Sequence, residues 1–441
     1  MNRRNLAVLS LVPALLVATA CSGGGGDGGG SGESGGGDVT LTYWASNQGT
    51  SLDNDREVLT PVLEDFTEQT GIAVDLEVIG WSDLQTRIQT AVTSGQAPDV
   101  VNIGNTWAVS LQATGAFLPF DDAAMETIGG ADKFVETALE TGGAEGTDPT
   151  SVPLYGLAYG LYYNRAMFEQ AGLQPPTTWE EMVSAAQALT DPDAGVYGMA
   201  LAAGSYTENN HFAFINATQN GAELFDDDGN PTFTEDGVVD GIVRYLDLMQ
   251  SDDVVNPSNA QYDNASLAVA DFATGKAAMI LNQNNANATI EANGMSPDQY
   301  GVVPFPAPAD APSDVASHVA GINMSVFANT EHPDEALQLV AHMTSQEVQT
   351  TLGKPFSSLP VLKDAEAVFT EDAEQAEIFT QIYNERSAPL PLVPAEDQFE
   401  TTVGQAMNRM FATVATGGTV TADDVREAMQ AAQDQVQASV G

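Results

Sequence analysis

The order of strand and helix patterns after residue 38 is the feature that most restricts the fold of this chain. The segments 39–44, 72–79 and 100–103 have the alternating or continuous apolar residues that are typical of strands. Between them, apolar residues recur four positions apart at about 53–69 and 82–94, as on one face of a helix. This β-α-β-α-β order predicts an α/β fold with a mostly parallel sheet and helices on both faces. In such sheets, ligands bind at the loops beyond the carboxyl ends of the strands.

These loops are rich in tryptophan and in side chains that form hydrogen bonds. The candidate binding residues are Trp44, Asn47 and Gln48 after the first strand, Trp81 and Asp83 after the second, and Asn105 and Trp107 after the third. Aromatic rings suit the apolar C–H faces of a sugar. Amides and carboxylates suit its hydroxyl groups. The loops therefore predict a site for a polyhydroxylated ligand.

Each aromatic candidate also has a purely structural interpretation. Trp44 could end a core strand, and Trp107 could seal the start of a helix. Trp81 could pack as a hydrophobic staple before an N-cap, and Asp83 could favour a helix N-terminus through the helix dipole. The fourth tryptophan, Trp179, begins a helical pattern and is predicted to be structural.

Two later regions add candidates. The run from Tyr155 to Tyr163 predicts a single strand, on which Tyr155 and Tyr159 lie four apart and therefore on the same face. Further amides that could bind hydroxyl groups are Asn282, Asn284 and Asn323.

The segment 225–233 predicts a strand, a turn and a second strand. Its three aspartates resemble part of a calcium loop, but the Gly and Glu positions of an EF-hand hold Pro231 and Gly237. We therefore expect a hairpin without calcium. The last third of the chain is predicted to be largely helical.

The order and spacing of several short motifs resemble the extracellular solute-binding proteins of ABC importers, in the carbohydrate-binding group that includes maltose-binding protein. The matching stretches are Ser94–Val101, Gly115–Phe120, Val152–Glu181, Phe272–Met279, Tyr300–Pro306 and Gly321–Asn323. The resemblance implies a two-lobed periplasmic-binding-protein-like fold, with a mostly parallel sheet flanked by helices in each lobe and a hinge between the lobes.

The resemblance also implies how the chain is divided between the lobes. Lobe 1 is expected to contain residues 39–152 and about 296–350, and lobe 2 residues 153–295 and about 351–441. The first crossing between lobes is expected near Pro153 and the second near Asn282.

The function implied by the resemblance is capture of a small carbohydrate by hinge closure and delivery to permease subunits in the membrane. The expected ligand is a mono-, di- or oligosaccharide or a polyol, without catalysis, cofactor or metal, and the protein is expected to be a monomer. Relatives often carry a sugar-stacking tryptophan shortly after the Gly275–Met279 motif, whereas this chain has amides at 282–285. This departure favours a small or polar ligand. The alternative is a binding protein for a cationic solute such as a polyamine.

The start of the chain has the features of an exported lipoprotein. Residues 1–20 combine two arginines, an apolar run and small residues, as in a signal peptide. The small residues before Cys21, which is the single cysteine, resemble a lipobox, so Cys21 is the expected lipidation site. Residues 21–38 would then tether the body to the outer face of the cytoplasmic membrane. The alternative is an ordinary secretion signal with an unmodified thiol.

The charge and the residue inventory exclude other classes of function. With 61 acidic and 13 basic residues the net charge is −48, which repels nucleic acids and anionic membrane surfaces. The acidic residues are scattered along the chain, as in a solvated acidic surface suited to high salt. The chain has four histidines without metal-ligand spacing and no Gly-x-Ser-x-Gly motif, so an enzyme is not expected.

Overall fold

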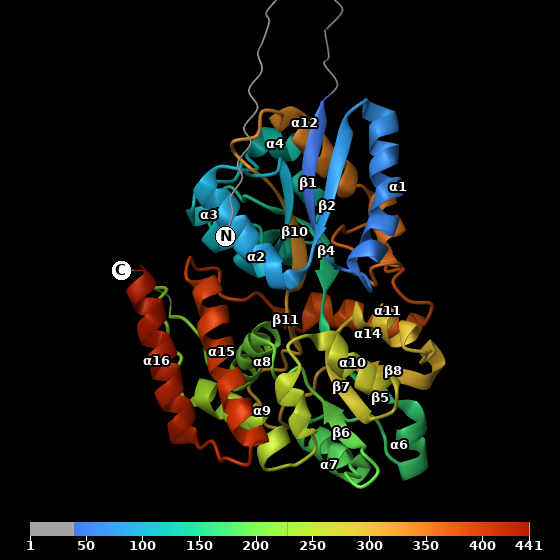
Figure 1. Cartoon of the computed structure of the whole chain (residues 1–441), viewed down its shortest axis with the longest axis vertical. Coiled ribbons are helices and arrows are strands. Elements are labelled where there is room, and N and C mark those ends of the chain that lie inside the picture. The colour runs from blue at the N-terminus through green and yellow to red at the C-terminus, as the bar shows by residue number, and fades with distance from the viewer. Residues whose placement is uncertain (1–38, 227, 441) are drawn as a thin grey trace, which may run out of the picture. The chain divides into compact units, whose positions relative to one another are not determined.

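The computed structural model describes residues 39–226 and 228–440 (Figure 1). The predicted signal peptide, Cys21 and the tether lie outside the described residues. None of the helices in the described ranges has both the length and the apolar composition that a membrane span needs.

The first sheet contains the predicted β-α-β-α-β unit. Its strand order is β2-β1-β3-β10-β4. The strands are β1 (Thr40–Ser46), β2 (Ala73–Ile79), β3 (Val100–Gly104), β4 (Val152–Leu157) and β10 (Ala320–Val326). Strand β1 pairs in parallel with β2 and β3, whereas β10 pairs antiparallel with β3 and β4. The parallel unit is confirmed, but the complete sheet is mixed.

Local sequence explains the helices of this unit. Helix α1 (Leu52–Thr70) begins at the N-cap Ser51, whose side chain accepts a hydrogen bond from the Asn54 amide. It ends at Gly71, whose φ of 77° is the left-handed conformation that glycine adopts readily. Helix α2 (Trp81–Ser94) begins one residue before Ser82 and covers one face of the sheet with α3 (Ala108–Ala113) (Figure 1).

The second sheet has the order β6-β7-β5-β8. Its strands are β5 (Tyr159–Asn164), β6 (Tyr197–Ala200), β7 (Ala277–Gln283) and β8 (Tyr300–Val303). Only β6 and β7 are parallel; β5 pairs antiparallel with both β7 and β8. The prediction that this sheet is mostly parallel was therefore wrong. The reason is that β5 enters the sheet directly from the first sheet and not through a β-α-β crossover.

The chain crosses from the first sheet to the second at Ala158, between β4 and β5 (Figure 1). The predicted single strand from Tyr155 to Tyr163 is thus two strands in different sheets, and Tyr155 and Tyr159 do not share a strand face. Both strands are buried on both faces, so their sequence has no alternation to mark the break.

Strand membership also bears on the expected lobes. Strand β8, inside the segment 296–350 that was expected in lobe 1, pairs with β5 of the second sheet. The later return to the first sheet falls between β8 and β10, beyond the expected position near Asn282. The other lobe boundaries stay predictions.

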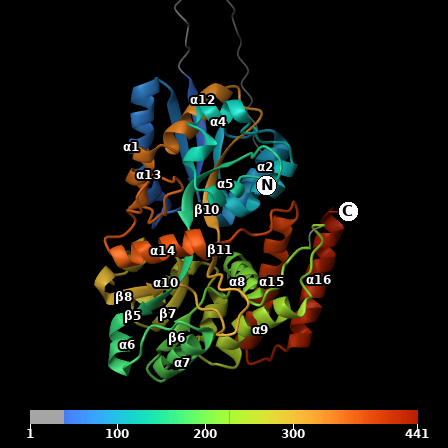
Figure 2. The same cartoon turned by 180° about the vertical axis from the view of Figure 1, so that it is seen from behind.

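The remaining elements are mostly helices, and the prediction of a helical last third is confirmed. Helices α8, α9, α15 and α16 pack together beside the second sheet, as Figures 1 and 2 show from opposite sides. The α-helices not yet given are α4 (Asp122–Thr127), α5 (Glu136–Glu140), α6 (Arg165–Ala171), α7 (Trp179–Leu189), α8 (Tyr206–Gln219), α9 (Asp236–Gln250), α10 (Ala265–Ala273), α11 (Ala286–Ala292), α12 (Pro333–Met343), α13 (Gln346–Gly353), α14 (Ala373–Glu385), α15 (Glu396–Ala415) and α16 (Ala422–Val440). The short 3₁₀ segments are η1 (Asn105–Trp107), η2 (Ala131–Lys133), η3 (Pro257–Gln261) and η4 (Pro297–Gln299), and the two-residue strands β9 (Ser317–His318) and β11 (Ser387–Ala388) pair in parallel.

Two local predictions are confirmed. Trp179 is buried at the start of α7, where its ring meets Phe305 edge to face. Phe225 and Pro231 form an antiparallel bridge around a turn in which the Asp226 carboxylate accepts backbone N–H bonds, so this segment is a hairpin.

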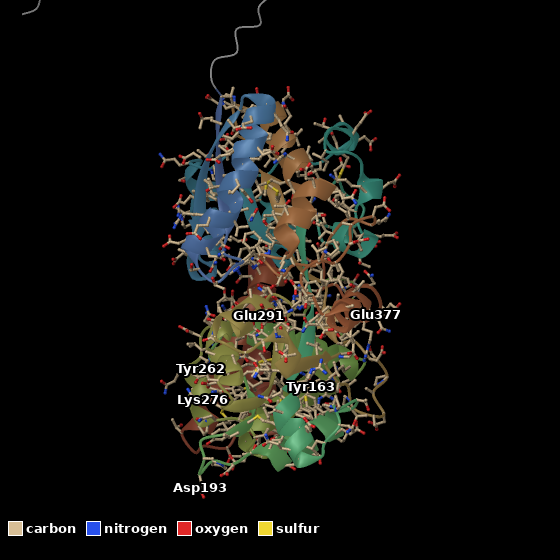
Figure 3. The ribbon with its side chains drawn as sticks, turned by 90° about the vertical axis from the view of Figure 1, so that its right-hand side faces the viewer. Tyr163, Asp193, Tyr262, Lys276, Glu291 and Glu377 are labelled. Carbon is tan, nitrogen blue, oxygen red and sulfur yellow. The ribbon has the colours of Figure 1, made fainter. Side chains whose placement is uncertain are left out.

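The acidic residues are widely spread over the surface. Figure 3 shows three of them, Asp193, Glu291 and Glu377, with exposed side chains. Exposed carboxylates of this kind keep most of their hydration and contribute little to folding individually.

Candidate functional site

The loop at the carboxyl end of β1 is held by a buried carboxylate. Asp55, in the first turn of α1, accepts hydrogen bonds from the backbone N–H groups of Gln48 (3.0 Å) and Gly49 (2.6 Å) and from the Asn47 side chain. Burial raises the pKa of Asp55, although these three bonds oppose the shift. The backbone carbonyl of Asn47 in turn accepts the Trp81 indole N–H at 2.7 Å. Asn47, Gln48 and Trp81 are thus brought together.

Two of the predicted tryptophans form a pair at this end of the first sheet. The rings of Trp81 and Trp107 meet edge to face, with centroids 5.6 Å apart. Trp81 is 36% exposed, whereas Trp107 in η1 is only 6% exposed. Neighbouring Asn105 donates to the carbonyl of Val319 at 2.7 Å, which fixes η1 against the segment before β10.

Glutamate and histidine side chains from other parts of the chain lie next to Trp107. The Trp107 indole N–H donates to Glu400 Oε2 on α15 at 3.1 Å. On the other side of Glu400, its Oε1 lies 3.9 Å from His211 Nε2 on α8. The Tyr159 hydroxyl donates to Glu208 Oε2 at 2.9 Å and lies 2.9 Å from His211 Nδ1. The His318 ring from β9 lies 4.1 Å from the His211 ring.

We call this set of side chains the polar cluster. Its members come from η1 after the first sheet, from β5 of the second sheet, from β9 and from helices α8 and α15: Trp107, Tyr159, Glu208, His211, His318, Glu396 and Glu400.

Several buried polar atoms of the polar cluster have no hydrogen-bond partner. They are both carboxyl oxygens of Glu396, Oε1 of Glu400 and Nδ1 of His318. Glu396 and Glu400 are each 2% exposed, and His318 is 1% exposed. Because more than nine in ten buried polar groups in proteins are hydrogen-bonded, such a concentration indicates a place where a ligand, a water molecule or an ion supplies the missing partners.

A small cavity adjoins these atoms. It measures about 10 Å³, roughly the space of one water molecule, and is lined by residues that include Asn105, Thr106, Val319, Leu390 and Glu396. The cavity therefore lies between the carboxyl end of the first sheet and the N-terminal end of α15.

The surroundings of Glu208, Glu396 and Glu400 shift the pKa values of these three carboxyl groups in different directions. Burial, and then repulsion from Glu400, raise the pKa of Glu396 well above its usual range. Burial also raises the pKa of Glu208, which His211 and Tyr159 offset only in part. Burial acts on Glu400 in the same direction, but the neighbouring His211, together with Thr106 and Trp107, outweighs it and lowers the pKa of Glu400.

His318 is the neutral imidazole of the pair. Burial, and then the neighbouring His211, lower the pKa of His318 well below its usual value. The polar cluster thus favours one ionised carboxylate at Glu400 and uncharged forms of Glu396, Glu208 and His318 when no ligand is bound.

Other sequence candidates have different surroundings. Trp44 lies on the face of the first sheet that α2 covers, with the Arg87 guanidinium carbon 4.5 Å from its ring centre. Arg87 also pairs with Glu77, on the neighbouring strand. Asp83 is exposed in the first turn of α2. Contact of these residues with a ligand stays a prediction.

The three candidate asparagines use their amides within the protein. Asn323 donates to the Ser151 hydroxyl at 3.0 Å, and Asn282 accepts from the Gln283 amide at 2.9 Å. Asn284 accepts from the Ala158 amide at 2.8 Å and donates to the Ser357 carbonyl at 2.5 Å.

Two candidates keep an unpaired oxygen. Tyr155 packs edge to face on Phe356 and its hydroxyl is buried without a hydrogen-bond partner. The side-chain carbonyl of Gln48 is also buried and unpartnered, while its amide donates to the Asn47 carbonyl at 3.2 Å.

Sequence reasoning missed Glu208, His211, His318, Glu396 and Glu400. For two of them a signal was present. The apolar stripe of α15 contains Phe399, Val403 and Met407, and Glu396 and Glu400 continue the same face toward its N-terminus. Charged residues on the buried face of a helix are rare unless paired, so this pattern could have identified them.

A larger open hollow of about 480 Å³ lies between α7 and α9, and its lining includes Trp179 and Arg244. The Arg244 guanidinium is already bonded to Asn216, Asn220 and Gln219. Because this cation is satisfied internally, we place the candidate site at the polar cluster. Across the part of the chain that the structure describes, no group of three His, Cys, Asp or Glu residues could hold a metal ion.

Residues 48–350 match the family model described as bacterial extracellular solute-binding protein. The chain therefore belongs to this family of extracellular binding proteins, which are not enzymes.

Individual relatives are distant. A multiple sugar-binding protein of Streptococcus mutans is 25% identical over 317 residues, covering 70% of this chain and 71% of that protein. Among solved structures, a solute-binding protein of Thermotoga lettingae bound with α-D-tagatose superposes with a TM-score of 0.78 at 23% identity, covering 92% of this chain and all of that one (100%). A solute-binding protein of Agrobacterium radiobacter in complex with ribitol gives a TM-score of 0.75 at 21% identity, covering 91% of this chain and 98% of that chain. These structures share the fold, an α/β architecture with two mixed sheets flanked by helices.

Proposed function

We propose that this protein is the solute-binding component of an ABC importer and that it captures a small carbohydrate or polyol in the polar cluster. The observation that carries the proposal is the set of buried, unpartnered atoms on Glu396, Glu400 and His318 beside a small cavity between the carboxyl end of the first sheet and α15. Hydroxyl groups can donate to the carboxylates and accept from imidazole, so a polyol satisfies all of them. The relatives named above, which bind sugars or ribitol, support this class of ligand.

The tryptophan pair supplies the apolar part of such a site. Trp107 presents its ring beside Glu400, and Trp81 packs against it at the more exposed edge. An aromatic contact contributes about 1 kcal/mol beyond its buried area, and a hydrogen bond about 1 kcal/mol net. Specificity would then come from the carboxylates and the amides of Asn105 and Gln48.

Binding is proposed to act by closure of the two sheets around the solute. The bond from Trp107 to Glu400 joins a segment of the first sheet to a helix of the second, so it exists only when these parts are together. A ligand that touches both sides stabilises this closed form selectively. The closed form would be the one that docks on the permease.

The anchor remains part of the proposal. Lipidation of Cys21 at the outer face of the cytoplasmic membrane would keep the binding protein near its permease, and the small residues before Cys21 support it. Replacement of Cys21 by alanine should move the protein from the membrane fraction to the medium, and a soluble wild-type protein would contradict the anchor.

Thermal-shift measurements test the ligand class. A ligand at 100 times its Kd adds about 2.7 kcal/mol to the stability of a folded protein. With an unfolding entropy of about 2.1 cal/mol/K per residue over roughly 400 residues, this raises Tm by about 3 °C. D-Tagatose, maltose, ribitol, erythritol and spermidine form a first panel. At least one sugar or polyol should raise Tm, and a response to spermidine alone would reject the proposal.

A further inference from the structure

The polar cluster contains three glutamates and no lysine or arginine. Among the ion pairs of residues 39–226 and 228–440, Glu400 pairs only with His211, at 3.9 Å, and Glu208 and Glu396 pair with no basic residue. Burial and the neighbouring His211 lower the pKa of His318, so the basic side chain that faces a carboxylate of the cluster is His211, 3.9 Å from Glu400. The site is therefore deficient in positive charge.

Glu396 is the group most affected by this deficiency. It is the first residue of α15, and Glu400 follows one turn later on the same face. Both Glu396 oxygens are buried without an N–H or O–H donor, the Glu400 carboxyl is the group that can share a proton with them, and Glu396 lines the cavity. A buried carboxylate without a cation is costly and either takes up a proton or acquires a positively charged partner.

The neutral alternative would be a plain polyol, whose hydroxyl groups donate hydrogen bonds without charge. Such a ligand would satisfy the hydrogen bonds of Glu396 but would leave two adjacent carboxyl groups with His211, near Glu400, as their basic neighbour. A ligand with its own positive charge satisfies both requirements. A ligand with a carboxylate or phosphate would add to the excess of negative charge and is disfavoured.

We propose that the natural solute carries a protonated amine that binds between Glu396 and Glu400, and hence that it is an amino sugar or an amine-bearing polyol. This inference rests on the proposed function, because the hydroxyl groups of the same ligand occupy the rest of the polar cluster. The Trp107 ring beside Glu400 adds a face on which an ammonium group is stabilised. Hydrogen bonds between charged partners are roughly twice as strong as neutral ones, so the amine is the principal determinant of specificity.

Matched pairs of ligands separate the amine from the sugar. Isothermal calorimetry on the full-length protein would compare D-glucose with D-glucosamine, cellobiose with its diamino analogue chitobiose, and D-glucitol with 1-amino-1-deoxy-D-glucitol. D-Glucuronate and spermidine complete the panel. In at least one pair the amine should bind about tenfold more tightly than its neutral partner, and glucuronate should bind more weakly than glucose.

A variant of nearly the same shape tests the assigned residue. Glu396→Gln keeps the side-chain size and removes the charge, so the affinity ratio between amine and neutral partner should fall to about one. Glu427→Gln, an exposed glutamate on α16, is the matched control and should keep the wild-type ratio. Circular dichroism and melting curves verify that each variant is folded, and Glu400→Gln provides a second test if Glu396→Gln does not fold.

The outcomes distinguish the two proposals. Equal or tighter binding of the neutral partners would contradict the amino-sugar inference but not the carbohydrate-binding function. An amine preference that survives in Glu396→Gln would also contradict the amino-sugar inference. Binding of spermidine without any sugar, or of no compound in the panel, would reject the carbohydrate function and the amino-sugar inference together.

Discussion

Asn284 connects three separate parts of the chain at the place where it crosses between the sheets. Its side-chain oxygen accepts from the Ala158 amide at 2.8 Å, and its backbone N–H donates to the Ala158 carbonyl at 3.1 Å. Its side-chain nitrogen donates to the Ser357 carbonyl at 2.5 Å. Asn284 is fully buried. We therefore predict that its main role is to stabilise the crossing.

Replacement of Asn284 by alanine removes both side-chain hydrogen bonds and leaves the Ala158 N–H and the Ser357 carbonyl without partners. Each buried unsatisfied group costs about 1–3 kcal/mol, so the free energy of unfolding should fall by about 4 kcal/mol. With an unfolding entropy of about 2.1 cal/mol/K per residue over roughly 400 residues, this lowers Tm by about 5 °C.

Urea denaturation followed by circular dichroism measures this change. Asn293→Ala is the matched control, because Asn293 is an exposed asparagine that donates only to the Thr289 carbonyl of its own helix. The control should shift the free energy of unfolding by less than about 0.5 kcal/mol. Asn284→Ala with the stability of the control would refute the crossing role, and a simultaneous loss of sugar affinity would restore Asn284 as a ligand residue.

Two further predictions concern the polar cluster. Trp107→Phe removes an N–H donor to the ionised Glu400, a hydrogen bond worth about 1.5–3 kcal/mol. Ligand affinity measured by calorimetry should therefore fall about tenfold or more. Unchanged affinity would mean that this hydrogen bond does not depend on closure. The second prediction concerns the pH dependence of stability. The pKa of Glu396 is raised in the folded protein, so above about pH 4.5 the native protein binds more protons than the unfolded chain. The stability due to Glu396 therefore falls as pH rises. Glu396→Gln should therefore be more stable than the wild type at neutral pH, with a gain that shrinks toward pH 4, and a pH-independent difference in urea midpoints would contradict the assignment.

The first part of the fold was predictable because its signals are local. The helix expected at about 53–69 is α1 at Leu52–Thr70, and the strand expected at 39–44 is β1 at Thr40–Ser46. In both, one face is buried and the other is exposed, so the periodicity of the sequence directly reflects the geometry. The parallel order of β1, β2 and β3 then follows from the helices between them.

The crossing and the second sheet were not predictable in this way. Strands β4 and β5 are buried on both faces and are separated only by Ala158, so neither alternation nor a turn residue marks the break. The antiparallel pairing of β5 with β7 joins residues more than a hundred positions apart. Such pairings depend on how the sheets assemble, which the local pattern does not record.

Some of the residues in and around the polar cluster could be predicted from the sequence. The rule that ligands bind beyond the carboxyl ends of parallel strands led to Asn105, which lines the cavity, to Trp107, which contacts Glu400, and to Trp81, which packs on Trp107. The acidic half comes from α8 and α15, far away in the chain. With 61 acidic residues in the sequence, only their position on a buried helix face distinguishes Glu396 and Glu400 from the rest.

The buried and the exposed acidic residues act on a cationic solute in different ways. The net charge of −48 attracts cations over long distances, but at physiological ionic strength this attraction is largely screened beyond about 8 Å. Glu396 and Glu400 are buried and are screened much less. The exposed carboxylates can therefore speed the arrival of a cationic ligand at low salt, whereas a preference for an amine that persists at high salt comes from groups inside the site, the two carboxylates and the Trp107 ring. Because the whole surface of the protein is acidic, the carboxylates that select an amine over a neutral solute must be buried away from water. Glu396 and Glu400, in and after the first turn of α15, are buried in this way.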